Sequence, residues 1–198
     1  RHMPEAFIAE CDRIYAERLE GAAERIMENM SRSPIVLLSG PSGSGKTTTS
    51  MKIAEALEKR GVGTHYVSMD DYFKTVDPGT APRTPEGELD LESPRCLDME
   101  LLNRHFTMLS RGEKIFVPKY EFSRQMRVTE PSKSIQLKKD EIVVFEGIHA
   151  LNDMITDAHP EAFKLYISAR SDVMFNDQVV FKGTWFRLVR RMVRDHNF

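Results

Sequence analysis

Cysteine is scarce in this chain of 198 residues, which contains only Cys11 and Cys96. Two cysteines in unlike segments lack the density of a disulfide-stabilised secreted scaffold, so the composition favours a reducing compartment. No run approaches the roughly 20 consecutive apolar residues that a membrane-spanning helix needs. The first residues also lack the charged, apolar and small-residue succession of a signal peptide. These shortages predict a cytoplasmic protein without a membrane partner.

An excess of charge of one sign is also missing. The chain has 28 Lys and Arg against 30 Asp and Glu, a formal net charge of −2. No global basic field attracts it to nucleic acid, so we expect no nucleic-acid partner. A chain of this length can bury a sizeable core and is expected to form one domain, or one domain with an appendage.

Glycine is concentrated in one segment that directly follows the apolar residues 35–38. It reads Gly40-Pro41-Ser42-Gly43-Ser44-Gly45-Lys46-Thr47, a complete G-x-x-x-x-G-K-[ST] phosphate loop. The glycines let backbone N–H groups surround the phosphates, the lysine reaches the outer phosphates, and the threonine hydroxyl can ligate Mg²⁺. The predicted ligands are ATP and Mg²⁺. The predicted nucleotide-binding residues are Gly40, Ser42, Gly43, Ser44, Gly45, Lys46, Thr47 and Thr48.

Short β-rich runs alternate with helical patterns after residue 34. Strands are expected at 35–39, 64–69, 114–118, 142–146 and 164–168, with helices at about 46–60 and 98–110. Strands separated by helices imply parallel β-α-β units. The fold class is therefore α/β, with three layers and a mainly parallel sheet.

Two further segments stand outside that alternation, and one loop is unusually long. Apolar residues in 5–30 recur near the 3.6-residue period of an amphipathic helix, while 173–181 places two apolar arms around an Asn-Asp turn, as in a β-hairpin. We divide the chain into an N-terminal helix and linker, 1–33, and a main domain, 34–198, whose C-terminal end we expect to be truncated. The Pro- and Gly-rich residues 75–95 are expected to form a functional or disordered loop.

Two carboxylates occupy positions where chemistry is expected. Asp70 follows the strand at 64–69, and the carboxyl ends of parallel strands face the ligand crevice. In phosphoryl transfer a carboxylate there can accept the proton of an acceptor hydroxyl, although Asp70 could instead cap a helix. Glu146 ends the apolar run 142–145 and could hold Mg²⁺ with Thr47, or be an ordinary strand-terminal acid.

Basic residues recur at helical spacing near the C-terminus, at Arg187, Arg190, Arg191 and Arg194. Such a stripe is usually a solvated surface. In a protein that holds a triphosphate, arginines on a mobile helix can close over it and neutralise charge during transfer. We predict that arginines of this stripe act with Lys46 and Asp70 in catalysis.

At these residues the chain resembles uridine kinases of the phosphoribulokinase/uridine kinase family. The resemblance rests on five motifs in the family's order: the phosphate loop, Ser68-x-Asp70-x-x-Phe73, Pro118-x-Tyr120-Glu121-Phe122 with Arg127, Val144-Phe145-Glu146-Gly147-Ile148, and Arg190-Arg191-x-x-Arg194-Asp195. It implies a P-loop kinase fold and transfer of the ATP γ-phosphate to the 5′-hydroxyl of a nucleoside, a small-molecule substrate. Asp70 matches the family's catalytic aspartate, and Arg190 and Arg194 match its lid, so the resemblance implies that these two arginines act in catalysis. The substrate-binding residues that we predict are Asp70, Tyr72, Glu92, Tyr120, Gln125, Arg127 and Arg191.

Departures from the family pattern keep other functions open. Gln125 stands where the family has a histidine near the base, and Glu92 and Glu121 replace shorter aspartates. A kinase of another small alcohol, such as pantothenate or a sugar phosphate, is the first alternative. The second is a regulatory NTPase without an acceptor, and the third is an inactive kinase-like module. The helix at 5–30 has no counterpart in small uridine kinases, so it could join a lost N-terminal domain or form a homo-oligomer surface.

Overall fold

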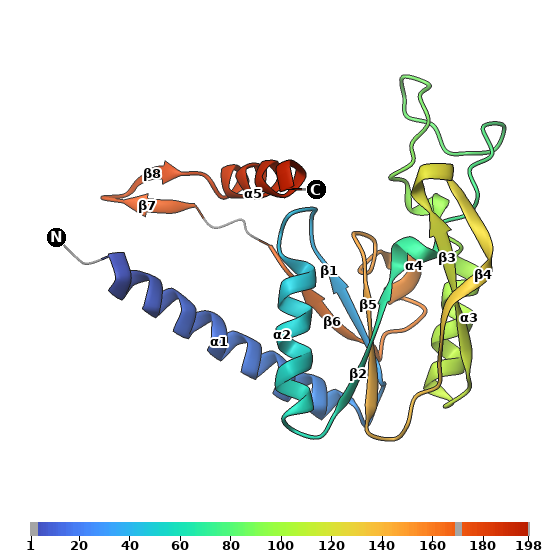
Figure 1. The fold of residues 1–198 in the computed structure, drawn as a ribbon, viewed down its shortest axis with the longest axis horizontal. Helices are drawn as coiled ribbons and strands as arrows, with labels where there is room; N and C mark the ends of the chain where they lie inside the picture. The colour runs from blue at the N-terminus through green and yellow to red at the C-terminus, as the bar shows by residue number, and fades with distance from the viewer. Residues whose placement is uncertain (1–3, 169–171, 198) are drawn as a thin grey trace.

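The computed structural model describes residues 4–168 and 172–197 and contains a four-stranded parallel sheet at its centre (Figure 1). Its strands are β1 (Ile35–Ser39), β2 (Gly63–Ser68), β5 (Glu141–Glu146) and β6 (Phe163–Tyr166), in the order β2-β5-β1-β6. The α/β class and the mainly parallel sheet predicted from the sequence are confirmed.

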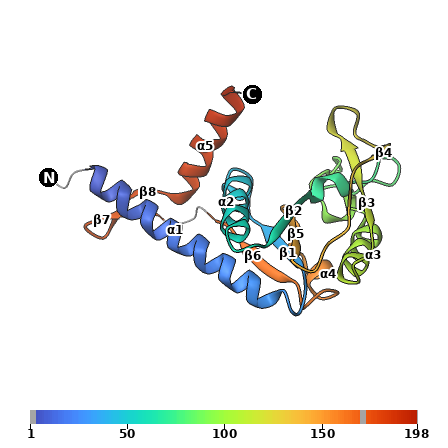
Figure 2. The same cartoon turned by 60° about the horizontal axis from the view of Figure 1, so that its bottom comes forward.

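Helices cover both faces of this sheet, which makes three layers (Figures 1 and 2). On one face α1 (Pro4–Asn29) and α2 (Lys46–Glu58) pack against Val36 and Leu38 of β1. On the other face α3 (Met99–Ser110) and α4 (Asp153–Thr156) lie beside Ile35 and Leu37. Side chains alternate between the faces of a strand, so a continuous apolar strand such as β1 supplies both cores.

The β-strand at Ile115–Glu121, β3, differs from the expectation that it joins the parallel sheet. It pairs antiparallel with β4 (Met126–Ile135) in a separate two-stranded sheet. Only the short turn η3 (Phe122–Arg124) joins them, and a parallel pairing would need a longer crossover connection. No β4 is predicted from the sequence, because most of its residues are exposed and lack the alternation of a half-buried strand.

The remaining segments agree with the predicted elements. Strands β7 (Val173–Phe175) and β8 (Gln178–Phe181) form the expected hairpin, with positive φ at both Asn176 and Asp177 of the turn. The helix α5 (Gly183–Asn197) follows it. Within the described residues no helix is both long enough and apolar enough to cross a bilayer.

The long loop at 75–95 contains almost no regular structure. The short helices η1 (Met69–Tyr72) and η2 (Pro94–Cys96) lie at its two ends. Hydrogen bonds attach it to the β3–β4 sheet, from the Val76 amide to the Gln125 carbonyl (3.0 Å) and from the Arg127 amide to the Thr75 hydroxyl (3.1 Å). The loop is thus held against the sheet that the sequence did not fully predict.

Candidate active site

Strand register brings the predicted phosphate loop and both predicted carboxylates to one edge of the parallel sheet. Glu146 of β5 pairs with Leu38 of β1 and with Ser68 of β2. The phosphate loop begins just past β1, and Asp70 lies in η1 just past β2. Ligands bind at this carboxyl edge in open α/β sheets.

The phosphate loop has the backbone that close approach to an anion requires. Gly43 and Gly45 have φ angles of 74° and 91°, in the left-handed region that favours glycine. A Cβ atom added at Gly45 would lie 3.0 Å from Nη2 of Arg190. The loop leads directly into α2, whose first amides and positive dipole end face the same space. This cradle fits a polyphosphate.

A cavity of about 470 Å³ lies over the cradle. It is lined by Ser42, Gly43, Gly45, Lys46, Thr47, Thr48, Asp70, Glu146, Ile148 and Arg190. The structure therefore brings Asp70 together with the predicted metal-binding residues and with the predicted nucleotide-binding residues, apart from Gly40 and Ser44, which do not line the cavity. Gly40 remains structurally required, because a Cβ there would lie 2.2 Å from the Ile167 carbonyl oxygen.

Oxygen ligands for a divalent cation meet at the floor of this cavity. The Thr47 hydroxyl lies 3.4 Å from Oε2 of Glu146, and Mg²⁺ prefers oxygen ligands and usually retains water and phosphate oxygens. No cluster of three or more His, Cys, Asp or Glu suited to a metal occurs among residues 4–168 and 172–197. Thr47 and Glu146 thus fit a cation that phosphates help to hold.

Both carboxylates have raised pKa values. Burial by the surrounding chain removes water from the carboxyl groups of Asp70 and Glu146. This loss of hydration favours the neutral acids and is the largest cause of both raised pKa values. Lys46 opposes this shift at both groups. Its Nζ donates to the Gly40 carbonyl at 2.9 Å, so the ammonium is held within the loop.

The helix α5 lies across the phosphate loop (Figure 1). Nε of Arg187 donates to the Ser42 carbonyl at 3.4 Å, and Arg190 contributes to the cavity wall. A Cβ atom added at Gly43 would lie 3.9 Å from the Cβ atom of Arg191. Arg194 belongs to α5, but its side chain lies outside the described residues. The predicted lid therefore contacts the loop, mainly through Arg187 and Arg190.

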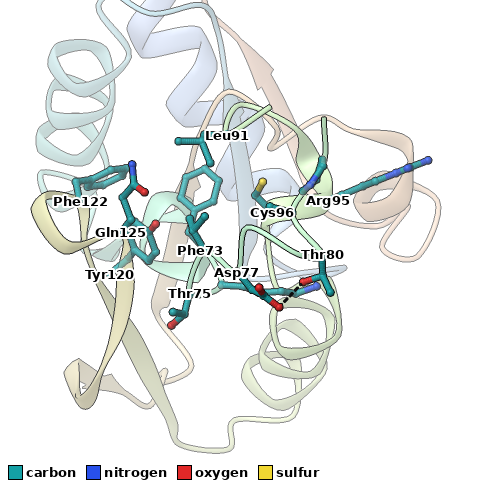
Figure 3. A pocket seen from close by; sticks show the side chains of 14 residues that line it. Phe73, Thr75, Asp77, Thr80, Leu91, Arg95, Cys96, Tyr120, Phe122 and Gln125 are labelled. Carbon is teal, nitrogen blue, oxygen red and sulfur yellow. Dashed lines mark hydrogen bonds between the residues drawn. The ribbon is translucent and has the colours of Figure 1, made fainter. Parts of the chain in front are cut away.

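A second cavity, of about 360 Å³, opens beyond η1 (Figure 3). Phe73, Tyr120 and Phe122 form an aromatic cluster in its wall, with ring centroids 5.0–6.1 Å apart. Gln125, in the left-handed conformation with φ of 50°, also lines it. Tyr120 and Gln125, which are both predicted to bind substrate, thus line the same cavity. Phe73 and Phe122 carry no site prediction, although both occur in the quoted motifs.

Three predicted substrate-binding residues lie elsewhere. The side chain of Tyr72 is fully buried and its hydroxyl lies 2.8 Å from Nδ1 of His105, so the expected substrate contact is wrong. Arg127 has a structural role, because its guanidinium donates hydrogen bonds to the Asp98 carboxylate at 2.8 Å and to the Tyr72 carbonyl at 2.9 Å. Glu92 is exposed and lines neither cavity, while its carbonyl accepts a hydrogen bond from His149 at 2.7 Å.

A family model for the phosphoribulokinase/uridine kinase family matches residues 35–181, most of the chain. The chain belongs to this family. A uridine kinase of Macrococcus caseolyticus is 30% identical over 167 residues, which are 84% of this chain and 70% of that protein. The Saccharomyces cerevisiae uridine kinase is 28% identical over 161 residues, 81% of this chain. The chain spans only 31% of that yeast protein.

Solved structures support the same fold. One neighbour, from Silicibacter sp. TM1040 and with the provisional name of fructose transport system kinase, has a TM-score of 0.59 at 21% identity. The alignment covers 91% of this chain and 83% of the neighbour. A protein described as a possible uridine kinase from Bacillus stearothermophilus has a TM-score of 0.52 at 18% identity. This alignment covers 81% of this chain and 82% of that protein. At these identities the likeness concerns the fold.

Proposed function

We propose that this protein is a nucleoside kinase that transfers the γ-phosphate of ATP to the 5′-hydroxyl of a nucleoside. The observation that carries the proposal is the position of Asp70 in the cavity that the phosphate loop and Glu146 also line. A carboxylate facing the phosphate cradle is what an alcohol acceptor requires and what simple nucleotide binding does not. The uridine kinases among its relatives support the acceptor class.

The chemistry that we propose is an in-line displacement. The acceptor oxygen forms a bond to the γ-phosphorus, the bond from that phosphorus to the bridging oxygen of ADP breaks, and the hydroxyl proton passes to the Asp70 carboxylate. Lys46 and Arg190 stabilise the charge on the transferring group, because both cations line the cavity. Thr47 and Glu146 would hold Mg²⁺, which neutralises phosphate charge when it is bound.

The aromatic cavity is the proposed site of the acceptor. Three rings at its wall suit the planar face of a base, and the Gln125 amide offers both a donor and an acceptor to the edge of a base. The short helix η1 joins the two cavities, since Asp70 lines one and Phe73, just past its end, lines the other. A nucleoside held by its base could therefore present a hydroxyl to Asp70.

Gln125 favours a second candidate, a kinase of another small alcohol. Its donors and acceptors differ from those of the family's histidine, so the base edge that it could recognise differs too. A regulatory NTPase without an acceptor is the other alternative, and it predicts ATP hydrolysis that no alcohol accelerates. A cytoplasmic location and a homo-oligomer remain predictions.

The test is a coupled assay for ADP with a panel of nucleosides, pantothenate and sugar phosphates. We expect ADP formation that depends on a nucleoside, with uridine and cytidine as the first choices. Turnover of another alcohol alone would move the assignment to the second candidate. No turnover of any of them by the folded chain with ATP and Mg²⁺ would refute the kinase function.

A further inference from the structure

A third cavity, of about 480 Å³, lies on the other side of the phosphate loop, between α1, α2 and the end of β6. None of the functions above uses it. Four residues of α1, a helix outside the residues that the family model matches, belong to its wall. They are Tyr15, Arg18, Leu19 and Ala22. Figure 2 shows α1 passing alongside α2 and β6.

The two cavities at the phosphate loop are neighbours, because Gly45, Thr48 and Arg190 line both. Asp70 and Glu146 line only the first. In-line transfer requires the terminal phosphorus to be on the Asp70 side. The opposite end of the triphosphate must then leave the first cavity past Gly45 and Thr48, which is where the third cavity begins.

The third cavity suits the nucleoside end of the donor. Its volume is within the range of small-molecule sites, about 300–1,000 Å³. Leu19, Ile53 and Leu165 give it apolar walls for a base. The Tyr15 hydroxyl lies 2.8 Å from Oγ1 of Thr49, and this bond uses only one of their two hydroxyl hydrogens, so the second can donate to a ligand.

Arg18 adds a positive charge to the same wall. Its side chain is exposed, and within residues 4–168 and 172–197 no hydrogen bond or ion pair of its guanidinium is found. Arg13 of the same helix differs, because it pairs with Glu10 and Glu17. An arginine that has no ion pair within the described residues and lies in a cavity wall suits acceptor atoms of a base, a ribose or the first phosphate.

We infer that α1 is a wall of the donor's nucleoside site, in which Tyr15, Arg18 and Ala22 contact the ribose and base of ATP. The inference rests on the proposed use of ATP at the phosphate loop, and it gives α1 a binding role in this chain. The helix is held there by Leu19, Ala23 and Ile26, which are buried against β1 and α2. A wall that is packed into the core is preorganised for a ligand.

The test compares two probes, ATP and inorganic tripolyphosphate, by calorimetric titration in the presence of Mg²⁺. Tripolyphosphate fills the phosphate cradle but has no nucleoside. Ala22→Leu places a larger side chain in the cavity wall, and we expect it to weaken ATP binding about tenfold and to change tripolyphosphate binding less than twofold. Ala16→Leu is the matched control, because Ala16 is exposed on the same helix and does not line the cavity.

A folded Ala22→Leu protein that binds ATP as tightly as the unchanged chain would overturn the inference, as would an equal loss for both probes. If Ala22→Leu does not fold, Arg18→Ala decides, since its side chain is exposed. We expect that variant to lose about fivefold in ATP affinity, with Arg13→Ala unchanged, and no loss would overturn the inference. The titrations need no acceptor, so a missing kinase activity would leave their outcome intact.

Discussion

At the scale of single residues, Asp70 and Lys46 line the same phosphate cavity, and we propose that Asp70 acts on the acceptor and Lys46 on the donor. Asp70 lies just past β2, while Lys46 begins α2 and is held by loop carbonyls. The ammonium lowers the pKa of Asp70 against the effect of lost hydration. Substitutions at the two positions should therefore have different consequences.

Asp70→Asn should abolish transfer and spare ATP binding. The amide keeps the size of the side chain but cannot take the acceptor proton, so we expect kcat to fall by at least about a hundredfold. ATP affinity, measured by calorimetry, should change little. A large loss of affinity in this variant would instead make Asp70 a nucleotide or metal ligand.

Lys46→Ala should weaken triphosphate binding itself. The ammonium is a point charge within the cradle, so its removal takes away one of the two cations that line the phosphate cavity. We expect at least a tenfold rise in the dissociation constant of ATP in the same titration. Unchanged affinity would contradict the assignment of the pocket.

At the scale of elements, the contact between α3 and η1 fixes the strand end that carries Asp70. Tyr72 of η1 is buried, and its hydroxyl meets His105 of α3. The rings pack edge to face with centroids 5.6 Å apart. Burial is the main reason that the pKa of His105 is lowered to about 4, with Arg104 adding to the shift.

The lowered pKa of His105 predicts a loss of stability in mild acid. At pH values between about 4, the pKa in the folded chain, and about 6.5, the ordinary pKa of histidine, His105 binds a proton in the unfolded chain but not in the folded chain. The free energy of unfolding should therefore fall as pH decreases through this window, by up to about 3 kcal/mol. Urea unfolding at pH 7 and at pH 5 measures it.

His105→Asn is the control for that window, because it removes the titrating ring from the same site. We expect a lower stability at pH 7 and a smaller fall toward pH 5 than in the unchanged chain. An equal fall in both proteins would assign the pH dependence to other groups.

The helix α5 is the second element that bears on function. Arg187 bonds the phosphate loop and Arg190 lines both cavities that adjoin it. A helix that contacts the loop by its arginines can respond to the charge placed there. The expected movement of this helix as a lid remains a prediction.

At the scale of the whole molecule, the sequence predicts the parallel sheet, the hairpin and the phosphate cavity well. Their signals are strong, because β1 and β5 are continuous apolar runs and the loop pattern is complete. The antiparallel β3–β4 sheet is predicted poorly, since its second strand is polar and exposed. The pairing of β3 with β4 across the short turn η3, which the apolar pattern of β4 does not indicate, decides that part of the fold.

In the candidate active site, too, some features can be predicted from the sequence and others cannot. Asp70 and Glu146 meet because parallel strands end at one edge, a rule that sequence reasoning can apply. Tyr72 is not accessible, although its motif position suggests a substrate contact, because the turn of η1 directs it into the core. The role of α1 in the third cavity depends on packing between helices and carries no motif.

The central claim is that the phosphate cradle and Asp70 together direct the γ-phosphate to an alcohol. The most direct measurement follows the fate of that phosphate by ³¹P NMR with ATP, Mg²⁺ and uridine or another alcohol that supports ADP release. The account predicts one equivalent of a phosphate monoester for each ADP, and little ADP when the alcohol is omitted. Inorganic phosphate formed at the same rate with and without any alcohol would contradict it.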